Sequence, residues 1–305
     1  MEDRKIVKLA SIDDYNKLYG MATTHPLVTV VDLKNATKSV NHVRMEYGVY
    51  ALFLKNDANC TIYYGRKAYD YQEGTVTSFS PGQIIGVDLK NDIIAPDVIG
   101  LIFHPDLIYG TPLGSRIGGF RFFDYSQREA LHLSQAEREL FVDCLMKIKS
   151  EAEHPVDHHS AALLSANILV LLEYVDRFYD RQFITRHKVN SDIVAKFERQ
   201  LKEYYSEGGA ADGVPSVAYF ADKANLSAGY FGDLVRKETG VTAQEMISRH
   251  VIDMARRRLV ETSDDVSVIA YDLGFQYPQH FTRLFKRVTG QSPTLYRQSQ
   301  DVRNS

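Results

Sequence analysis

The strongest constraint on this chain is an internal repeat close to its C-terminus. The segments Phe220–Ala243 and Ile269–Pro293 carry similar residue types at matching positions, about fifty residues apart, with one extra residue in the second copy. Each copy has an Ala four residues before Asn225 or Gly274, and each has a Thr-Gly pair further on. A repeat of this period requires one structural unit that is used twice.

The repeated unit has the pattern of a helix-turn-helix. Asn225 and Gly274 are the residue types that most readily adopt positive φ, so each predicts a sharp turn after a short first helix. Ser227 is a suitable N-cap for the second helix, which should end at Gly240 in the first copy and at Gly290 in the second. The residues expected to face inward are Phe231, Leu234 and Val235, and Phe281, Leu284 and Phe285.

A single long helix, about Ala243 to Thr262, is predicted between the two copies. Thr242 and Glu245 have the spacing of a capping box, and an apolar stripe follows them. At 1.5 Å per residue such a helix is ~30 Å long. One turn of B-DNA is ~34 Å. A rigid spacer of this length could place two recognition helices in successive major grooves, so the segment predicts binding to double-stranded DNA.

The residues in and around the repeat resemble those of the AraC/XylS regulators, over about Ser191–Arg297. The positions that carry the resemblance are Asn225-Leu226-Ser227, Tyr230-Phe231, Lys237 and Gly240, then Ile269-Ala270, Gly274-Phe275, Phe281-Thr282-Arg283, Phe285-Lys286, Gly290, Pro293 and Tyr296-Arg297. The resemblance implies a transcription regulator with a seven-helix DNA-binding domain, in which the third and sixth helices read DNA. It also implies a cupin-like N-terminal domain for sensing or dimerisation.

The family pattern places an unusual face on the first recognition helix. Its outward residues by position are Ala228, Gly229, Gly232, Asp233 and Arg236. Glycine offers no side chain, and a carboxylate repels phosphate although it can accept a hydrogen bond from cytosine N4. We therefore expect that this helix either reads DNA by close approach of its backbone or contributes little specificity.

The second recognition helix has a richer outward face. Glutamine can bond adenine, arginine can bond guanine, and a threonine methyl can touch that of thymine. The candidate base-reading residues over both helices are Ala228, Asp233, Arg236, Gln279, His280, Thr282 and Arg283. The candidate phosphate contacts are Ser227, Lys237, Lys286 and Arg287. The run Arg256-Arg257-Arg258 favours a solvated helix face over a phosphate clamp.

The distribution of charge agrees with a DNA-binding end. The chain has a formal net charge of −3, but Leu273–Gln298 contains four Arg or Lys residues and no Asp or Glu. The remainder is therefore acidic, and an acidic body with a basic end should orient itself on a phosphate backbone.

The first part of the chain, to about Ser126, predicts a β-rich sandwich or small barrel. Short runs of strand-forming residues alternate with turn residues. The runs are Val28–Val31, Val49–Leu54, Thr61–Tyr64, Val76–Phe79, Ile84–Val87 and Val98–Phe103. Aromatic residues such as Tyr50, Tyr63, Tyr64 and Phe79 favour core packing over a ligand pocket. The expected fold class is α+β, with a cupin-like sensor domain over 1–130, dimerisation helices and a linker over 131–190, and an all-α DNA-binding domain over 191–305.

The middle segment is predicted to be helical. Ser134 and Glu137 have capping-box spacing. In Ala161–Phe178, apolar residues recur at a and d positions over a little more than two heptads. This seam predicts either a homodimer interface or a buried core helix. The polar stretch Asp180–Asn190 has no periodicity and is interpreted as a linker.

Several other sites are not supported by the residues. No two histidines have the His-x-His spacing of a cupin metal site, and His154 and His158 are better explained by a helix start. Cys60 and Cys144 are far apart. We therefore expect no catalytic residues, metal or cofactor, although a cupin-type metalloenzyme with a DNA-binding appendage is the alternative. No apolar run reaches the ~18 residues of a membrane span. The N-terminus shows no export signal, which favours a cytoplasmic protein. The effector stays unknown, and the front domain could instead serve dimerisation or a protein partner such as RNA polymerase.

Overall fold

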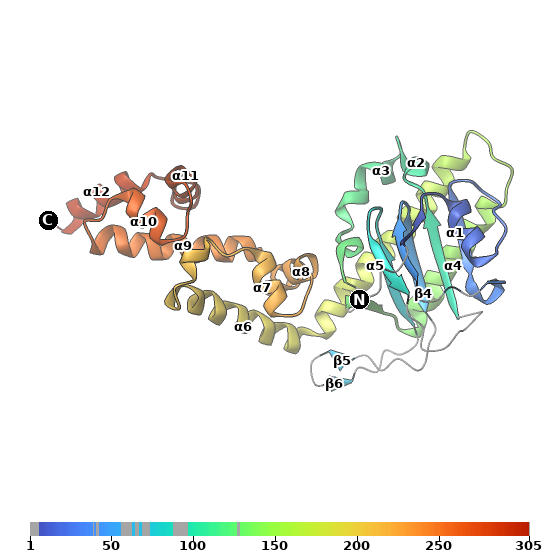
Figure 1. Cartoon of the computed structure of the whole chain (residues 1–305), viewed down its shortest axis with the longest axis horizontal. Coiled ribbons are helices and arrows are strands. Elements are labelled where there is room, and N and C mark those ends of the chain that lie inside the picture. The colour runs from blue at the N-terminus through green and yellow to red at the C-terminus, as the bar shows by residue number, and fades with distance from the viewer. Residues whose placement is uncertain are drawn as a thin grey trace. The chain divides into compact units, whose positions relative to one another are not determined.

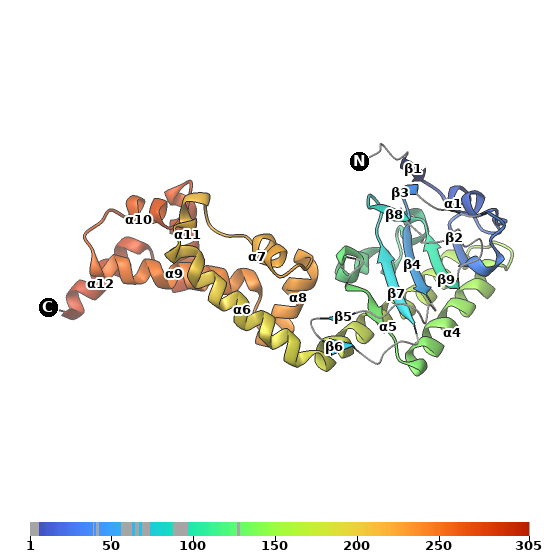
Figure 2. The same cartoon turned by 60° about the horizontal axis from the view of Figure 1, so that its bottom comes forward.

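The computed structural model describes residues 6–38, 40, 43–55, 63–64, 67–68, 74–87, 97–126 and 129–304. The chain divides into two compact units, Met1–Thr185 and Arg186–Ser305. All described strands belong to the first unit, while the described part of the second unit is helical (Figures 1 and 2). This confirms the predicted α+β class, with a β-rich N-terminal region and a helical C-terminal region.

The first unit contains two sheets that face each other and a separate two-stranded sheet formed by β5 and β6. The larger has the order β10-β7-β4-β9-β2 and is antiparallel, with Leu52 of β4 opposite Leu101 of β9. The smaller has the order β1-β3-β8, and its β1–β3 pair is parallel. The strands are β1 (Ile6–Leu9), β2 (Val28–Asp32), β3 (Val43–Tyr47), β4 (Tyr50–Lys55), β5 (Tyr63–Tyr64), β6 (Lys67–Ala68), β7 (Thr75–Phe79), β8 (Ile84–Val87), β9 (Val98–Phe103) and β10 (Leu131–His132).

The predicted strand runs are strands in the structure, with one partial exception. Thr61–Tyr64 contributes β5 through its last two residues, while the first two lie outside the described residues, as does Cys60. The sequence pattern did not predict β1, β3, β6 and β10. These are short, and β3 carries charged Arg44 and Glu46 among its apolar residues. The strand character of β1, β3 and β10 depends on pairing with residues that are distant in sequence.

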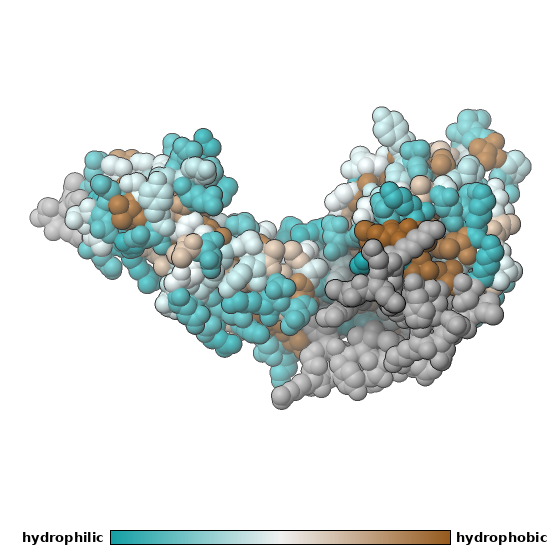
Figure 3. All heavy atoms as spheres, viewed as in Figure 1, coloured by the Kyte–Doolittle hydropathy of each residue, from teal (hydrophilic) through white to brown (hydrophobic). Residues whose placement is uncertain are grey.

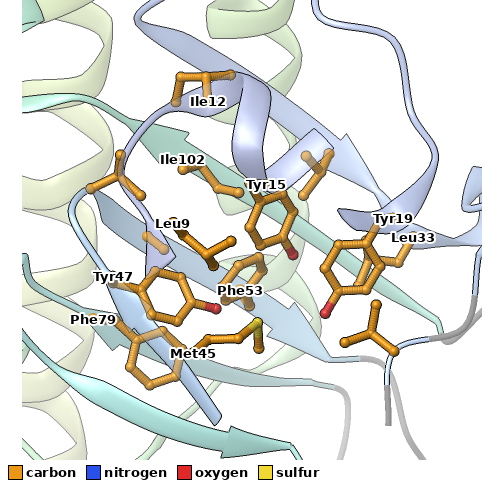
Figure 4. Packing of buried hydrophobic residues seen from close by; sticks show 14 of the residues in the cluster. Leu9, Ile12, Tyr15, Tyr19, Leu33, Met45, Tyr47, Phe53, Phe79 and Ile102 are labelled. Atoms are coloured by element: carbon orange, nitrogen blue, oxygen red, sulfur yellow. The ribbon is translucent and has the colours of Figure 1, made fainter. Parts of the chain in front are cut away.

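The space between the two sheets is filled by side chains. Helix α1 (Ile12–Tyr19) covers one end, and its Tyr15 lies beside Phe53 of the larger sheet and near Tyr47 of the smaller (Figure 4). Burial raises the pKa of both Tyr15 and Tyr47 well above the ordinary value of a phenol. Phe79 belongs to the same cluster. The preference for core packing is confirmed for Phe79, while the side chains of Tyr63 and Tyr64 lie outside the described part.

Helices follow the sheets in the first unit. Helix α2 is Pro105–Ile108, α3 is Pro112–Arg116, α4 is Gln135–Ala152 and α5 is Ser160–Thr185. The capping box at the start of α4 is confirmed, because Ser134 and Glu137 bond each other's backbone N–H groups. Helices α4 and α5 pack side by side, and α4 also contacts β2. Asp157 accepts hydrogen bonds from the backbone N–H of His159 and of Ser160, so this segment is the helix start that was expected.

The interpretation of the heptad seam as a dimer interface is wrong for most of its residues. Ile168 and Val175 at one heptad position, and Leu164, Leu171 and Phe178 at the other, are at most 4% exposed within a single chain. They form core contacts of the first unit because α5 lies against α4 and the sheet. A heptad repeat identifies the apolar face of a helix, but it does not identify what covers that face.

The prediction that Asp180–Asn190 is a linker is also wrong, because most of this stretch is helical. Helix α5 continues to Thr185, and α6 begins at His187. Gln182 is 1% exposed, and its buried amide is satisfied by hydrogen bonds. It accepts one from the His132 N–H at 2.9 Å and donates one to the Ala130 carbonyl at 3.3 Å. Polar residues that bond a strand backbone leave no apolar period in the sequence.

The second unit consists of seven α-helices over its described residues. They are α6 (His187–Ser206), α7 (Val217–Lys223), α8 (Ala228–Thr239), α9 (Ala243–Glu261), α10 (Val266–Asp272), α11 (Pro278–Thr289) and α12 (Pro293–Asn304). Helix α6 starts four residues before the expected Ser191. Its Phe197 packs edge-on against Phe220 of α7 and Phe231 of α8, which joins the first repeat unit to this helix.

Candidate nucleic-acid interface

The structure contains the helix-turn-helix unit twice. Helices α8 and α11 have 12 residues each and begin fifty positions apart. The turns before them are made by Asn225, with φ of 56°, and Gly274, with φ of 90°. Asn225 is the only residue other than glycine with positive φ in the described part of the chain. Both residues adopt the positive φ that the sequence predicts at these turns.

The two copies also end in the same way. Gly240 and Gly290 adopt φ of 76° and 84°, and each donates its N–H to the carbonyl four residues earlier. The hydroxyl of Thr239 donates to the Val235 carbonyl at 2.8 Å, and that of Thr289 donates to the Phe285 carbonyl at the same distance. Matching local hydrogen bonds show that the repeat in sequence is a repeat in structure.

Asn225 provides a direct test of the first turn. We expect Asn225→Gly to leave the free energy of unfolding nearly unchanged, because glycine adopts positive φ without a steric penalty. Asn225→Ala should lower it by about 1 kcal/mol, since alanine pays the left-handed cost of ~1–2 kcal/mol without the local hydrogen bonding of asparagine. Urea unfolding of the two variants measures the difference, and equal stabilities would contradict the assigned role.

Helix α9 connects the two helix-turn-helix copies and sets the distance between them. It has 19 residues, so it is ~28 Å long at 1.5 Å per residue. Thr242 and Glu245 form the predicted capping box. At its other end, Arg297 of α12 donates to the carbonyls of Leu259 at 2.9 Å and Asp264 at 2.7 Å. The end of the spacer is thus tied to the second helix-turn-helix.

The outward face of α11 is polar and cationic. Gln279, His280 and Arg283 are exposed, Thr282 is half-buried, and Phe281 and Phe285 are buried on the opposite face. Lys286 and Arg287 are exposed in the last turn. The surface over α11 is largely hydrophilic (Figure 3).

The cations on α11 have no acidic partner in the part of the chain that the structure describes. Among the residues that the structure describes, no ion pair involves Arg283, Lys286 or Arg287. Three exposed cations that no described residue neutralises form an attractive surface for phosphate and for acceptor atoms of bases.

The outward face of α8 differs from that of α11. Ala228, Arg236 and Lys237 are exposed, whereas Gly229 and Gly232 are half-buried. Asp233 was expected on the outward face, but the structure buries it, with 9% exposure. A buried carboxylate must satisfy its charge within the protein, so Asp233 is not an exposed base-reading group in this structure. The Ser227 hydroxyl accepts from the Tyr230 N–H at 3.2 Å, which confirms its predicted capping role.

The arginine run of α9 is largely paired within the protein. Arg258 contacts the carboxylates of Asp264 at 2.9 Å and Asp272 at 2.8 Å, and Arg256 contacts Asp253 at 3.0 Å. Hydrogen bonding from Arg258 holds the pKa of Asp264 below its ordinary value. Arg258 therefore links α9 to α10 and to the segment before α10, a structural role that the sequence pattern did not reveal.

The sequence also gave no sign of a close backbone contact at the second turn. A Cβ atom on Gly274 would lie 2.6 Å from the carbonyl carbon of Gly213 and 2.9 Å from the Val214 nitrogen. Gly213 is itself held by its carbonyl, which accepts from the Tyr204 hydroxyl at 2.9 Å. The loop before α7 is thus packed against the turn of the second copy. Gly213 is separated from Gly274 by about sixty residues, so only the fold brings the two together.

Comparison with known proteins agrees with this geometry. A family model described as a helix-turn-helix domain matches residues 220–299. RhaS of Enterobacter sp. (strain 638), an HTH-type transcriptional activator, is 36% identical over 156 residues, which are 50% of this chain and 51% of RhaS. The uncharacterised HTH-type transcriptional regulator YobQ of Bacillus subtilis is 32% identical over 82 residues, which are 27% of this chain and 34% of YobQ. The C-terminal part is an AraC/XylS-type DNA-binding domain.

The resemblance to the AraC/XylS domain is limited in extent. The chain matches about a third of the length of YobQ and of several other curated relatives, and about half of the length of RhaS from Enterobacter sp.. A solved structure of the C-terminal domain of AraT, a response regulator from Geobacillus stearothermophilus, aligns over 34% of this chain and 84% of its own length, with 21% identity and a TM-score of 0.30.

Among the residues that the structure describes, no three His, Cys, Asp or Glu side chains converge as a metal site would require. No helix in the described ranges combines the length and apolar character that crossing a bilayer demands.

Proposed function

We propose that this protein is a sequence-specific transcription regulator that binds promoter DNA through its tandem helix-turn-helix units. The observation that carries the proposal is the face of α11, where Gln279, His280 and Arg283 are exposed beside two further cations, and no described acid pairs with the cations. The duplicated unit and the ~28 Å helix α9 add a spacing close to the ~34 Å turn of B-DNA.

The proposal assigns different roles to the residues of α11. Gln279 and Arg283 lie one turn apart on the exposed face, where they can reach base edges in the major groove. His280 and Thr282 flank them. Lys286 and Arg287 lie in the last turn and contact phosphates, which positions the helix without reading sequence.

Helix α8 contributes less to specificity in this proposal. Its two glycines provide no side chain, and Asp233 is buried. Arg236 occupies the place in α8 that Lys286 occupies in α11, because the two helices start fifty residues apart. The DNA contact of α8 then tolerates many base sequences, and it is lined by Ser227, Ala228 and Lys237. The operator should therefore have one strictly required half, read by α11, and one variable half.

The N-terminal unit receives the regulatory signal in this proposal. A small effector would act if it binds one arrangement of the protein better than another. The two packed sheets support a cupin-like sensor over 1–130, followed by the helices α4 and α5 that serve self-association, and the DNA-binding domain that begins with α6. Promoter binding and contact with RNA polymerase would take place in the cytoplasm.

The proposed function is tested by selecting DNA from a random library with the purified full-length protein. We expect enrichment of one motif and a footprint that spans two successive major grooves on one face of the duplex. Recovery of DNA without a common motif, or affinity that is the same for selected and scrambled duplexes, would refute sequence-specific regulation.

Lys286→Ala separates the phosphate role from base reading. We expect weaker binding to selected and scrambled duplexes by a similar factor, and a salt dependence reduced by about one counterion, because one phosphate contact is lost. Gel-shift titrations over a range of salt concentrations measure both quantities. A loss confined to the selected duplex would instead assign Lys286 to a base.

A further inference from the structure

The two helix-turn-helix copies differ at the residue that precedes the second helix. Ser227 caps α8, because its hydroxyl accepts a hydrogen bond from the Tyr230 N–H at 3.2 Å. Tyr277 takes the same place before α11, and its side chain makes no capping hydrogen bond. Serine is among the preferred N-cap residues, since its short side chain satisfies a free N–H of the first turn. The second copy therefore lacks a stabilising contact that the first one has, and an aromatic residue stands in its place.

The side chain of Tyr277 lies at the surface beside the candidate base-reading residues. It is 55% exposed, and Gln279 and His280, which follow it closely in the chain, are exposed as well. The ring centroids of Tyr277 and His280 are 5.5 Å apart, and the two rings meet edge to face. They form an exposed aromatic pair at the N-terminal end of α11. This is the end of a recognition helix at which helix-turn-helix proteins contact base edges.

The backbone on both sides of Tyr277 is held in one conformation. Pro278 is the first residue of α11, and a residue that precedes proline is restricted to extended backbone. Tyr277 accordingly has φ of −132° and ψ of 120°. On its other side, the N–H of Phe275 donates to the Ala270 carbonyl at 3.0 Å, and the ring of Phe275 packs against that of Phe281. A rigid segment thus presents Tyr277, and a tyrosine side chain loses little conformational entropy on binding.

The chemistry of an aromatic ring fits one feature of the major groove. All four bases present hydrogen-bonding groups there, but only thymine also presents an apolar group, its C5 methyl. Apolar and aromatic side chains recognise thymine by contact with this methyl. The neighbouring Gln279 and Arg283 are suited to the hydrogen-bonding groups instead. Tyr277 is therefore the residue at this end of α11 that is best suited to a methyl group.

We propose that Tyr277 is a further specificity-determining residue, whose ring contacts the C5 methyl of one thymine in the operator. The inference rests on the proposed function, because it adds one base contact to the helix that reads DNA. It also accounts for the difference between the two copies. Ser227 stabilises the start of α8, whereas Tyr277 exchanges that stabilisation for a contact with DNA.

Replacement of thymine by uracil tests this contact directly. Uracil pairs as thymine does but lacks the C5 methyl, so each thymine of the selected duplex is replaced in turn and binding of the full-length protein is measured by gel shift. We expect at least one replacement to weaken wild-type binding by about fourfold, the equivalent of burying one methyl group. At that position Tyr277→Ser should bind both duplexes equally. Tyr277→Phe keeps the ring and should retain the fourfold difference.

The Tyr277→Ser variant also separates DNA contact from folding. Serine can cap α11 as Ser227 caps α8, so the variant should unfold thermally at or above the wild-type midpoint while it loses the methyl effect. The salt dependence of binding should stay the same, because tyrosine carries no charge. Tyr271→Ala is a matched control. Tyr271 is 56% exposed on α10 of the same copy, and its loss should preserve the fourfold difference.

The outcomes distinguish this contact from the proposed function. A selected motif without thymine, or a wild-type protein that binds all uracil duplexes as tightly, would overturn the contact. A methyl effect that survives Tyr277→Ser, or one that is lost in Tyr277→Phe or Tyr271→Ala, would overturn it as well. In each of these cases sequence-specific binding still stands. If selection yields no common motif, the proposed function fails, and the contact fails with it.

Discussion

Gly274→Ala should lower the free energy of unfolding of the C-terminal unit by about 2–5 kcal/mol and abolish specific DNA binding. Two effects add. Alanine at φ of 90° carries a left-handed penalty of ~1–2 kcal/mol. Its Cβ would also meet the Gly213 carbonyl carbon at 2.6 Å, and overpacking of this kind costs ~1–3 kcal/mol. The contact is with backbone atoms, so no side-chain rotation relieves it.

Gly290→Ala is the matched control for this prediction. Gly290 also has positive φ, 84°, but apart from its chain neighbours no atom of the described residues lies within 4 Å of the place where its Cβ would stand. The Gly290→Ala variant should therefore lose only the part of the free energy of unfolding that comes from the left-handed backbone, about 1 kcal/mol. Urea unfolding monitored by circular dichroism and gel shifts on the selected duplex measure the two variants. Equal losses at the two glycines would show that the contact with Gly213 does not constrain the turn.

Arg283→Ala should weaken binding to the selected duplex by about 10–100-fold, corresponding to ~1–3 kcal/mol. The side chain is exposed on α11 and pairs with no described acid, so the guanidinium is available for a bidentate contact with guanine. Binding to a scrambled duplex should fall much less, because that complex depends on phosphate contacts. The ratio of the two affinities is therefore the quantity that changes.

Competition gel shifts with selected, scrambled and single-base-substituted duplexes measure this ratio. The variant should tolerate substitution at one operator position that the wild-type protein requires. Arg199→Ala, which removes an exposed arginine of α6 next to Glu203, is the control for loss of one positive charge outside the repeat. An equal loss on selected and scrambled duplexes would assign Arg283 to the backbone and would reject base reading.

The two recognition helices, α8 and α11, differ in the residues on their outward faces. The two helices share their length, a C-terminal glycine with positive φ and a buried phenylalanine at matching positions, Phe231 and Phe281. However, positions 229, 232 and 233 of α8 hold Gly, Gly and a buried Asp where α11 holds Gln279, Thr282 and Arg283. The shared features are those that form the fold, and the differing features are those that would meet a base. This contrast supports α11 as the main source of specificity.

The structure of the DNA-binding domain could be predicted from the sequence because it depends on local interactions. The turns at Asn225 and Gly274, the helix ends at Gly240 and Gly290, and the capping box of Thr242 and Glu245 all depend on contacts within four or five residues. Such contacts follow from residue type and spacing, so sequence patterns identify them. The exposed face of α11 was predictable for the same reason, since helical period places Arg283 opposite the inward-facing stripe.

The amino-acid sequence alone therefore determined the repeat, its turns, the spacer helix and the strand-rich character of the first unit. Tertiary structure decided what covers each apolar or polar face. It buried the Ala161–Phe178 seam in the core rather than leaving it for a partner, extended α5 through a polar stretch bonded to β10, and brought Gly213 against Gly274. The physical reason is that residue spacing sets the period of a face, whereas its burial depends on segments that only the folded chain brings near it.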